Sequence, residues 1–446
     1  NPTWQGGFYI KRSGIMFKLK ERNTTVKTEI IAGLTTFLTV AYIIVVNPKI
    51  LSEAGVPFNQ AFTATIIATL VGTLCMAFLA NYPIIIAPAM GLNAYFAYSV
   101  LGTYNISYTV AFSAVFVTGI IFLILSLTSF RTKLITAIPD NLKHAISAGI
   151  GLFIAFIGLR LSGIVADHPT NLVALGDFTD PKVALTLIGL IITIILMTLN
   201  IQGSIFIGMV ITALIAYFTG QLHFNGIAAL PHLPEGALIT NPITSFNDVI
   251  NYGLYGVVFS FLLVMLFDTT GALLGIVRQA GLLKDGKLEK PGSAFFADSI
   301  GTTVGAVFGT SPTAASVESS AGVGAGGKTG LTALTVAVLF LITAFFSPLI
   351  GSLSDVAAIT APSLIIVGCF MIKSISDINW HDFDEAFPAF LVIVTMPLTS
   401  SIANGIALGF IAYPIMKIAK GKIREVHPFV YVFAILFLYQ LIFLAR

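Results

Sequence analysis

Three acidic residues lie in stretches of sequence that are otherwise apolar: Asp268, Asp298 and Glu318. A carboxylate at membrane depth is costly, so such acids normally face a cavity, a partner or a transported solute. Glu318 lies in a run of small residues, 312–327, which carries four glycines between positions 322 and 327. Glycines at this density disfavour a continuous helix, and irregular backbone in a membrane is tolerated only where it is packed in protein or lines a water-filled site. An acid beside a broken helix therefore indicates a substrate or ion site.

Glu318 is the first candidate for this site. Burial disfavours the charged form of a carboxylate, so we expect Glu318 to bind a proton on one side of the membrane and release it on the other. The alternative is a glutamate that caps backbone N–H groups at the break. Asp268, in the sequence Phe-Asp-Thr-Thr-Gly, is expected to accept a proton or orient a ligand, or else to cap a neighbouring unwound segment. For Asp298 a structural role is favoured over proton coupling.

A second break is predicted over residues 87–96, Ala-Pro-Ala-Met-Gly-Leu-Asn-Ala-Tyr-Phe. Pro88 and Gly91 disrupt helix. Asn93 adds an amide that both donates and accepts hydrogen bonds, which suits a heterocycle with donors and acceptors on its edge. The alternative is a packing asparagine bonded to a neighbouring backbone group.

One motif points to a different chemistry. Residues 322–329, Gly-Val-Gly-Ala-Gly-Gly-Lys-Thr, match the phosphate-binding loop pattern G-x-x-x-x-G-K-[ST]. That loop requires a strand, a helix and a second acid for Mg²⁺ in a soluble α/β domain, whereas here it joins two apolar segments. We therefore reject a nucleotide site and expect Lys328 to anchor at the membrane interface. The histidines show no metal-ligand spacing, and no catalytic site is predicted.

Composition places the chain among polytopic membrane proteins. It is 56% hydrophobic and 10% charged over 446 residues, with a mean hydropathy of +0.95, which no soluble domain of this size shows. A spanning helix needs about 20 mostly apolar residues. The net charge of +3 suggests no nucleic-acid partner, and Cys75 and Cys369 suggest neither a disulfide nor a metal site. Residues 1–15 are oddly composed, and Met16 is expected to be the natural start.

The apolar pattern predicts fourteen membrane spans and a further apolar stretch over 428–444, which either crosses the membrane or lies on its inner surface. The spans are expected near 29–47, 59–80, 84–100, 108–129, 141–161, 183–199, 203–219, 250–276, 292–309, 313–326, 330–350, 358–373, 386–399 and 402–418. The third and tenth are the two broken ones. Basic residues cluster at the N-terminus and after spans four, eight and fourteen, whereas the loop 221–249 has neither lysine nor arginine. Because basic loops stay cytoplasmic, the N-terminus is predicted to be cytoplasmic.

The two halves of the chain resemble one another. Residues 68–83 align with residues 297–312 at a constant offset of 229, with five of sixteen positions identical. Small residues recur in any helix-packing face, which is the alternative explanation. However, the matched proline precedes a broken segment in both halves, and seven spans per half require the second half to be inverted. Inverted repeats with paired broken helices are typical of transporters, whose site lies where the breaks meet.

Four segments together resemble the azaguanine-resistance branch of the nucleobase–cation symporters, the purine permeases for hypoxanthine, guanine and adenine. These segments are residues 32–48, 90–96 (Met-Gly-Leu-Asn-Ala-Tyr-Phe), 267–271 and 317–323 (Val-Glu-Ser-Ser-Ala-Gly-Val). The resemblance implies an all-α fold with a seven-plus-seven inverted repeat, a core that moves like an elevator, and a homodimer. The implied organisation is an N-terminal segment 1–28, core halves 29–129 and 250–350, gate halves 130–220 and 351–418, and a basic linker with an apolar stretch over 419–446.

The resemblance also implies roles for individual residues. Asn93 matches a polar residue that contacts the purine, Glu318 matches the acid that holds it, and Asp268 matches an acid of the eighth span. Many relatives carry a further acid one turn earlier, where this chain has Met265, which could form a soft apolar wall against the ring. Three small neighbours complete the predicted site: Ala89, Gly91 and Ser316.

We therefore expect a multi-pass plasma-membrane protein that imports a purine base by proton symport, with H⁺ preferred over Na⁺ and with no cofactor, metal or enzymatic activity. Membrane lipid and the purine are the expected partners. The alternatives are a uracil- or xanthine-type permease and an anion exchanger of the same architecture, although Glu318 would serve a negative substrate poorly.

Overall fold

The computed structural model describes residues 17–104, 106–128, 136–231, 238–284 and 288–444. Within these residues, nine helical stretches are long and apolar enough to span a membrane. The predicted class, an all-α polytopic membrane protein, is confirmed, whereas the count of fourteen spans stays a prediction. The basic cluster Arg131 and Lys133 and the questioned residues 1–15 lie outside the described part of the chain.

The elements of the first half follow the predicted apolar segments closely. They are α2 (Val26–Val40), α3 (Ile43–Glu53), α4 (Phe58–Cys75), η1 (Met76–Ala80), β1 (Ile86–Pro88), α5 (Met90–Ala94), η2 (Tyr95–Val100), α6 (Leu101–Tyr104), α7 (Tyr108–Ser126), α9 (Asp140–Leu161), β2 (Val165–His168), β3 (Leu172–Leu175), α10 (Pro181–Thr198) and α11 (Ser204–Phe218). The predicted segment 29–47 is divided, because α2 ends at Val40 and α3 begins at Ile43.

Within the described residues, the second half also consists of helices and one short strand. They are α12 (Ser245–Asn251), α13 (Tyr255–Gln279), α14 (Pro291–Phe308), β4 (Thr313–Ala315), α15 (Ser319–Gly324), α16 (Gly330–Thr343), η3 (Ala344–Phe346), α17 (Ser347–Asp355), α18 (Ala357–Ile372), η4 (Lys373–Asp377), α19 (Phe383–Leu398), α20 (Ile402–Ala419), η5 (Ile423–Glu425), α21 (Pro428–Tyr439) and η6 (Gln440–Leu444).

Ordinary capping signals set several boundaries. Thr25 and Thr329 accept backbone N–H groups at the starts of α2 and α16. Helix α14 begins with Pro291, whose missing N–H costs nothing in the first turn. It ends at Phe308 and is followed by Gly309, which has a φ of 100° that an L side chain rarely adopts.

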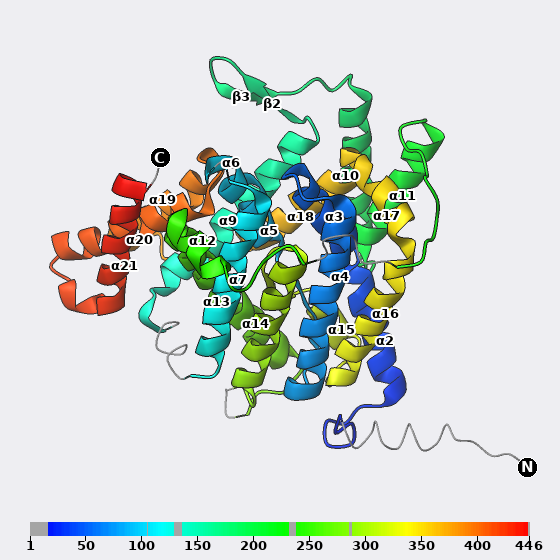
Figure 1. Cartoon of the computed structure of the whole chain (residues 1–446), viewed down its shortest axis with the longest axis horizontal. Helices are drawn as coiled ribbons and strands as arrows, with labels where there is room; N and C mark the ends of the chain where they lie inside the picture. The colour runs from blue at the N-terminus through cyan, green and yellow to red at the C-terminus, as the bar shows by residue number, and fades with distance from the viewer. Residues whose placement is uncertain (1–16, 105, 129–135, 232–237, 285–287, 445–446) are drawn as a thin grey trace, which may run out of the picture.

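The helices pack as two groups. In the first group, α14 packs against α4 and α7, α16 packs against α4 and α2, and α15 packs against α2. The second group contains α9, α18, α19 and α20, joined by α10 and α11. The division into core and gate halves stays a prediction. The β2–β3 hairpin and the start of α2 lie at opposite ends of the molecule (Figure 1).

The two predicted breaks meet as a short antiparallel strand pair, which packs against α4, α13 and α14. Strand β1 pairs with β4 in the register Ile86↔Ala315, Ala87↔Ala314 and Pro88↔Thr313. The pairing continues on both sides, since Ala89 N–H donates to the Pro312 carbonyl and Ser316 N–H donates to the Ile85 carbonyl, both at 3.0 Å. Each strand therefore satisfies the backbone groups that its interrupted helix leaves unpaired.

Candidate substrate-binding site

A cavity of about 280 Å³ lies beside the β1–β4 strand pair. This volume is close to the lower end of small-molecule pockets, about 300 Å³. We call it the central cavity. Its lining residues are Tyr42, Ile43, Ala87, Pro88, Ala89, Met90, Gly91, Ser147, Asp268, Ala314, Ala315, Ser316, Val317, Glu318, Val367, Phe370, Met371 and Ser374.

Glu318 is held in the central cavity by two hydroxyl groups. Tyr42 Oη donates to Glu318 Oε1 at 2.7 Å, and Ser316 Oγ donates to Glu318 Oε2. The residue precedes α15, but its side chain makes no capping hydrogen bond to that helix. The geometry thus departs from the capping alternative, and the carboxylate is half-buried at the cavity wall.

The structure brings five of the predicted site residues to this cavity: Ala89, Gly91, Asp268, Ser316 and Glu318. Asp268 comes from the middle of α13 and is half-buried. Within the described residues, no side chain or backbone group hydrogen-bonds its carboxylate. The central cavity therefore contains two acids in different settings, one bonded to hydroxyl groups and one without such partners.

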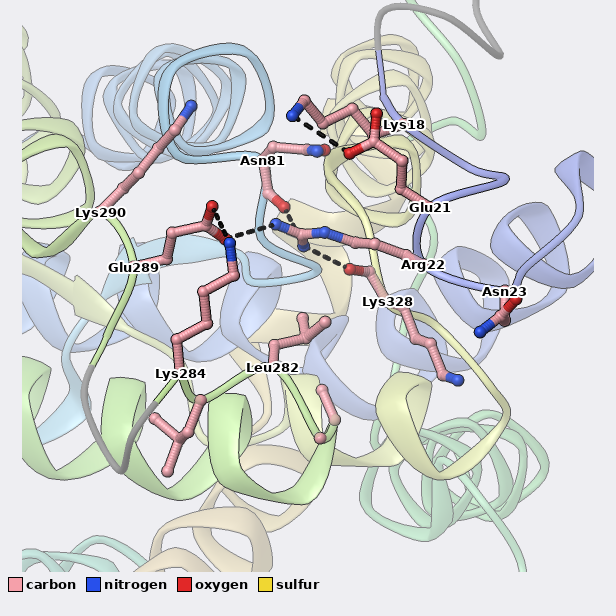
Figure 2. Close-up of a pocket in the computed structure, with 13 residues that line it drawn as sticks. Lys18, Glu21, Arg22, Asn23, Asn81, Leu282, Lys284, Glu289, Lys290 and Lys328 are labelled. Carbon is pink, nitrogen blue, oxygen red and sulfur yellow. Dashed lines mark hydrogen bonds and ion pairs between the residues drawn. The ribbon is translucent and has the colours of Figure 1, made fainter.

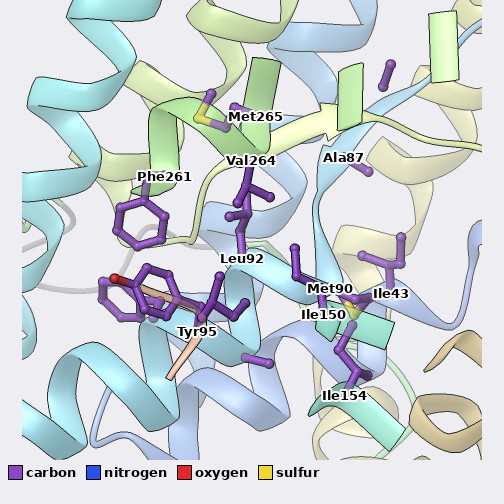
Figure 3. Packing of buried hydrophobic residues seen from close by; sticks show 14 of the residues in the cluster. Ile43, Ala87, Met90, Leu92, Tyr95, Ile150, Ile154, Phe261, Val264 and Met265 are labelled. Atoms are coloured by element: carbon purple, nitrogen blue, oxygen red, sulfur yellow. The ribbon is translucent and has the colours of Figure 1, made fainter. Parts of the chain in front are cut away.

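Asn93 and Met265 lie outside the set of lining residues. The Asn93 side chain is fully buried in α5, and its Nδ2 donates to the Asn47 carbonyl at 3.3 Å. That bond is the one expected of a packing asparagine, while Asn93 Oδ1 has no partner within the described residues. Met265 is fully buried on α13. In Figure 3 it lies beyond Val264, on the side away from Leu92 and Tyr95. Contact of Asn93 and Met265 with a substrate stays a prediction.

Asp298 is also outside the cavity, in a bonded setting. Thr269 Oγ1 donates to its Oδ2, and Thr313 Oγ1 donates to its Oδ1 at 2.9 Å. These bonds tie α13, α14 and β4 together. Breaking the hydrogen bonds of a buried carboxylate with both oxygens satisfied is costly. This favours the structural role over proton coupling.

Several cavity residues were not found from the sequence. Tyr42 contacts Glu318, yet in an apolar span a tyrosine looks like an ordinary packing residue. Ser147 and Ser374 also line the cavity, and Ser374 Oγ donates to Ser147 Oγ at 3.3 Å. They come from α9 and η4, so only the packing of the two helix groups brings them to the acid.

The phosphate-loop pattern has a different use in the fold. Glu29, in the first turn of α2, is fully buried and accepts the backbone N–H groups of Lys328 and Thr329 at 2.9 and 3.1 Å. It also accepts the Thr332 hydroxyl at 2.6 Å. Two N–H groups of the pattern are thus already occupied by a carboxylate of the protein. Glu29 is a structural acid that the sequence analysis did not identify.

A helical membrane fold with two interrupted segments around a polar cavity defines the class of a membrane transporter. Residues 27–408 match the model of the family described as the Permease family, and the chain belongs to this family. It is therefore a multi-pass membrane permease, a transporter and not an enzyme.

The curated relatives agree with the resemblance noted from the sequence motifs, which is confirmed. Guanine/hypoxanthine permease PbuO of Bacillus subtilis (strain 168) is 65% identical over 432 residues, covering 96% of this chain and all of the relative. Guanine/hypoxanthine permease PbuG of the same organism is 45% identical over 96% of this chain and 99% of the relative. Adenine permease AdeP of Escherichia coli (strain K12) is 41% identical over 96% of each chain.

Solved structures show the same fold at low sequence identity. The transmembrane domain of the cyanobacterial bicarbonate transporter BicA has a TM-score of 0.63 and 16% identity, covering 85% of this chain and 97% of that domain. The inward-facing murine anion transporter Slc26a9 has a TM-score of 0.64 and 13% identity over 88% of this chain and 68% of that one. At these identities the likeness concerns the fold alone.

Proposed function

We propose that this permease imports a purine nucleobase, with guanine or hypoxanthine preferred and adenine second. The support is the identity of 65% to a guanine/hypoxanthine permease over nearly the whole chain. The observation that carries the proposal is the central cavity itself, where a carboxylate with two hydroxyl neighbours faces a space of about 280 Å³. A carboxylate accepts hydrogen bonds from the ring N–H and amino groups of a purine.

In this proposal Glu318 holds the edge of the base that carries N–H donors. Ser316 and Tyr42 fix the orientation of the carboxylate, and the small residues Ala89 and Gly91 leave room for a flat ring. The apolar side chains Val367, Phe370 and Met371 form the facing wall, which suits the faces of the ring. The two acids would bind an anionic substrate poorly, which favours a nucleobase over an anion exchange function.

We further propose that uptake is coupled to H⁺ rather than Na⁺. Asp268 and Glu318 line one cavity, and burying two negative charges beside an apolar wall is costly. Binding of a proton together with the neutral base lowers this charge. The loaded core group could then move past the apolar gate group in an elevator-type step, with the N-terminus cytoplasmic and two copies forming a dimer.

Transport in proteoliposomes tests the substrate and the coupling separately. We expect uptake of labelled hypoxanthine that an inward proton gradient stimulates, and competition by unlabelled guanine before adenine. Uptake without any response to the gradient would remove the coupling, and absence of uptake for all purines would remove the substrate class.

Glu318→Gln tests the binding role. This substitution keeps the size of the side chain but removes its charge, and hydrogen bonds to charged groups contribute about 1.5–3 kcal/mol. We expect the affinity for hypoxanthine to fall at least about tenfold. Asp355→Asn, which changes an exposed carboxylate on α17, is the matched control and should leave affinity unchanged. An unchanged affinity of Glu318→Gln would leave Glu318 with only a structural role.

A further inference from the structure

A second cavity of about 320 Å³ lies apart from the central cavity, at the end of the molecule where α2 begins. Five cationic side chains line it: Lys18, Arg22, Lys284, Lys290 and Lys328. They come from the segment before α2, from the connection between α13 and α14, and from the turn before α16. Figure 2 shows Arg22 between Asn81, Lys328 and Glu289 in this basic cavity.

Positive charge exceeds negative charge within the described lining. Glu21 and Glu289 are its two acids, so five cations minus two carboxylates leave a net charge of +3. Glu289 is shared, because Lys284 Nζ lies 2.8 Å and Arg22 3.8 Å from its carboxylate. The hydrogen bond from Lys284 lowers the pKa of Glu289, so both members of this pair stay charged at neutral pH. Lys18 pairs with Glu21 at 3.2 Å.

Two of the cations have no acidic partner in the described part of the chain. Lys290 Nζ donates to the Leu79 carbonyl at 3.1 Å, and the Lys328 ammonium group makes no hydrogen bond or ion pair to a described residue. Both residues line the cavity. In Figure 2 the Lys328 ammonium group points away from the Arg22 guanidinium group, so its side chain has to rotate to reach an anion bound beside Arg22.

Arg22 is held in place before any ligand arrives. Its Nη1 donates to the carbonyl groups of Asn81 and Lys328, each at 2.7 Å, and its side chain is only 11% exposed. Because these carbonyl groups occupy Nη1 and Glu289 lies near Nη2, Arg22 contributes mainly a fixed positive charge. A fixed group loses little entropy when it attracts an anion, and lysine binds phosphate as a point charge.

We propose that this basic cavity binds a phosphate group, carried either by a soluble phosphomonoester or by the headgroup of an anionic lipid. Its volume leaves room for more than the phosphate itself. Basic pockets at the cytoplasmic end of membrane helices attract anionic headgroups, and a soluble ester could enter from the same side. A ligand in this cavity would contact both the segment before α2 and the connection between α13 and α14.

Binding to the purified, full-length protein tests this inference without any transport measurement. Ribose 5-phosphate is the soluble probe and ribose its uncharged control; neither carries a base that could enter the central cavity. Nanodiscs containing phosphatidylglycerol or only phosphatidylcholine are the lipid probes. Saturable binding of ribose 5-phosphate assigns a soluble ligand, and a higher melting temperature in phosphatidylglycerol assigns a lipid. Absence of both effects would overturn the proposal.

Variants then locate the site. Lys328→Gln removes a cation that has no described partner, so the variant should fold normally. We expect it to lower the affinity for the bound phosphate ligand roughly tenfold. The double variant with Lys290→Gln should abolish it. Lys27→Gln, an exposed basic residue in α2 outside the cavity, is the matched control and should change nothing. Equal binding by the double variant and the unmodified protein, with both melting alike without ligand, would contradict the site.

Discussion

Glu318 accepts hydrogen bonds from two hydroxyl groups, and hydroxyl groups can both donate and accept. When the carboxylate binds a proton, it becomes a donor to one neighbour and can still accept from the other. Tyr42 and Ser316 can therefore satisfy either protonation state by rotating their O–H bonds. This pairing suits an acid that gains and loses a proton during transport better than a fixed ion pair would.

Tyr42→Phe tests this role, since it removes only the hydroxyl group that reaches Glu318. A lost hydrogen bond to a charged group corresponds to about 1.5–3 kcal/mol, so we expect a KM for hypoxanthine raised roughly tenfold, with a normal melting temperature. Tyr98→Phe removes a hydroxyl that bonds to Glu53, outside the central cavity, and is the control. Similar kinetics for both variants would contradict the assigned role of Tyr42.

Residue identity predicted the acids of the site better than it predicted their neighbours. Glu318 and Asp268 could be singled out because charge is costly in an apolar span, and both line the central cavity. Asn93 is likewise a polar residue in an apolar span, yet its amide nitrogen donates to the backbone carbonyl of Asn47. A polar side chain in a span has to be satisfied, but the sequence does not state whether a ligand or the protein satisfies it. Tyr42 was not predicted as a site residue, because a tyrosine ring in an apolar span is usually an ordinary packing residue.

At the scale of elements, Gly91 in α5 makes a tight contact with α9 beside the central cavity. A Cβ atom at this position would lie 2.4 Å from Cγ2 of Ile150 on α9. Gly91 thus allows α5 to lie directly against α9, and Gly91 itself lines the central cavity.

Gly91→Ala should consequently impair transport by forcing α5 and α9 apart. Overpacking a tight contact costs typically about 1–3 kcal/mol, so we expect a lower melting temperature and a reduced rate of uptake. Ile150→Ala removes the methyl group in conflict, and the double variant should recover part of the lost rate. If the second substitution brings no recovery, the contact with Ile150 is not the cause.

Helix α16 offers a second test at this scale, because its start depends on Glu29 of α2. Glu29→Ala would leave two buried backbone N–H groups and the Thr332 hydroxyl without their acceptor, at about 1–3 kcal/mol for each unsatisfied group. We expect a clearly lower melting temperature and an unchanged KM for the folded fraction. Glu21→Ala, at an exposed position, should melt normally; equal melting of both variants would contradict the capping role.

The breaks themselves could be predicted, whereas their pairing could not. Pro88, Gly91 and the glycines after Glu318 interrupt helices by local rules that the sequence displays. Pairing β1 with β4 joins residues more than 200 positions apart, in a register decided by tertiary packing. The offset of 229 does place Ile86 on Ala315, which face one another in the pair (315 − 86 = 229). The offset between the two halves is therefore consistent with the register, but the offset alone does not say that the two segments pair as strands.

At the scale of the whole molecule, the orientation in the membrane follows from the distribution of basic residues. The positive-inside rule and the fold together predict that the β2–β3 hairpin is outside and that the segment before α2 is inside. In a variant with Cys75 and Cys369 replaced by serine, Leu172→Cys in the hairpin should react with an impermeant maleimide on intact cells. Glu21→Cys should react only after permeabilisation. The reverse pattern would invert the proposed topology.

The central claim is that a purine occupies the space between Glu318 and the paired strands. A cryo-EM map of the protein with bound guanine tests it most directly. We predict density for the base in the central cavity, within hydrogen-bond distance of Glu318, with one ring face toward the side chains Phe370 and Met371. Density for guanine elsewhere, such as in the separate cavity lined by Tyr98 and Arg160, with the central cavity empty, would contradict the account.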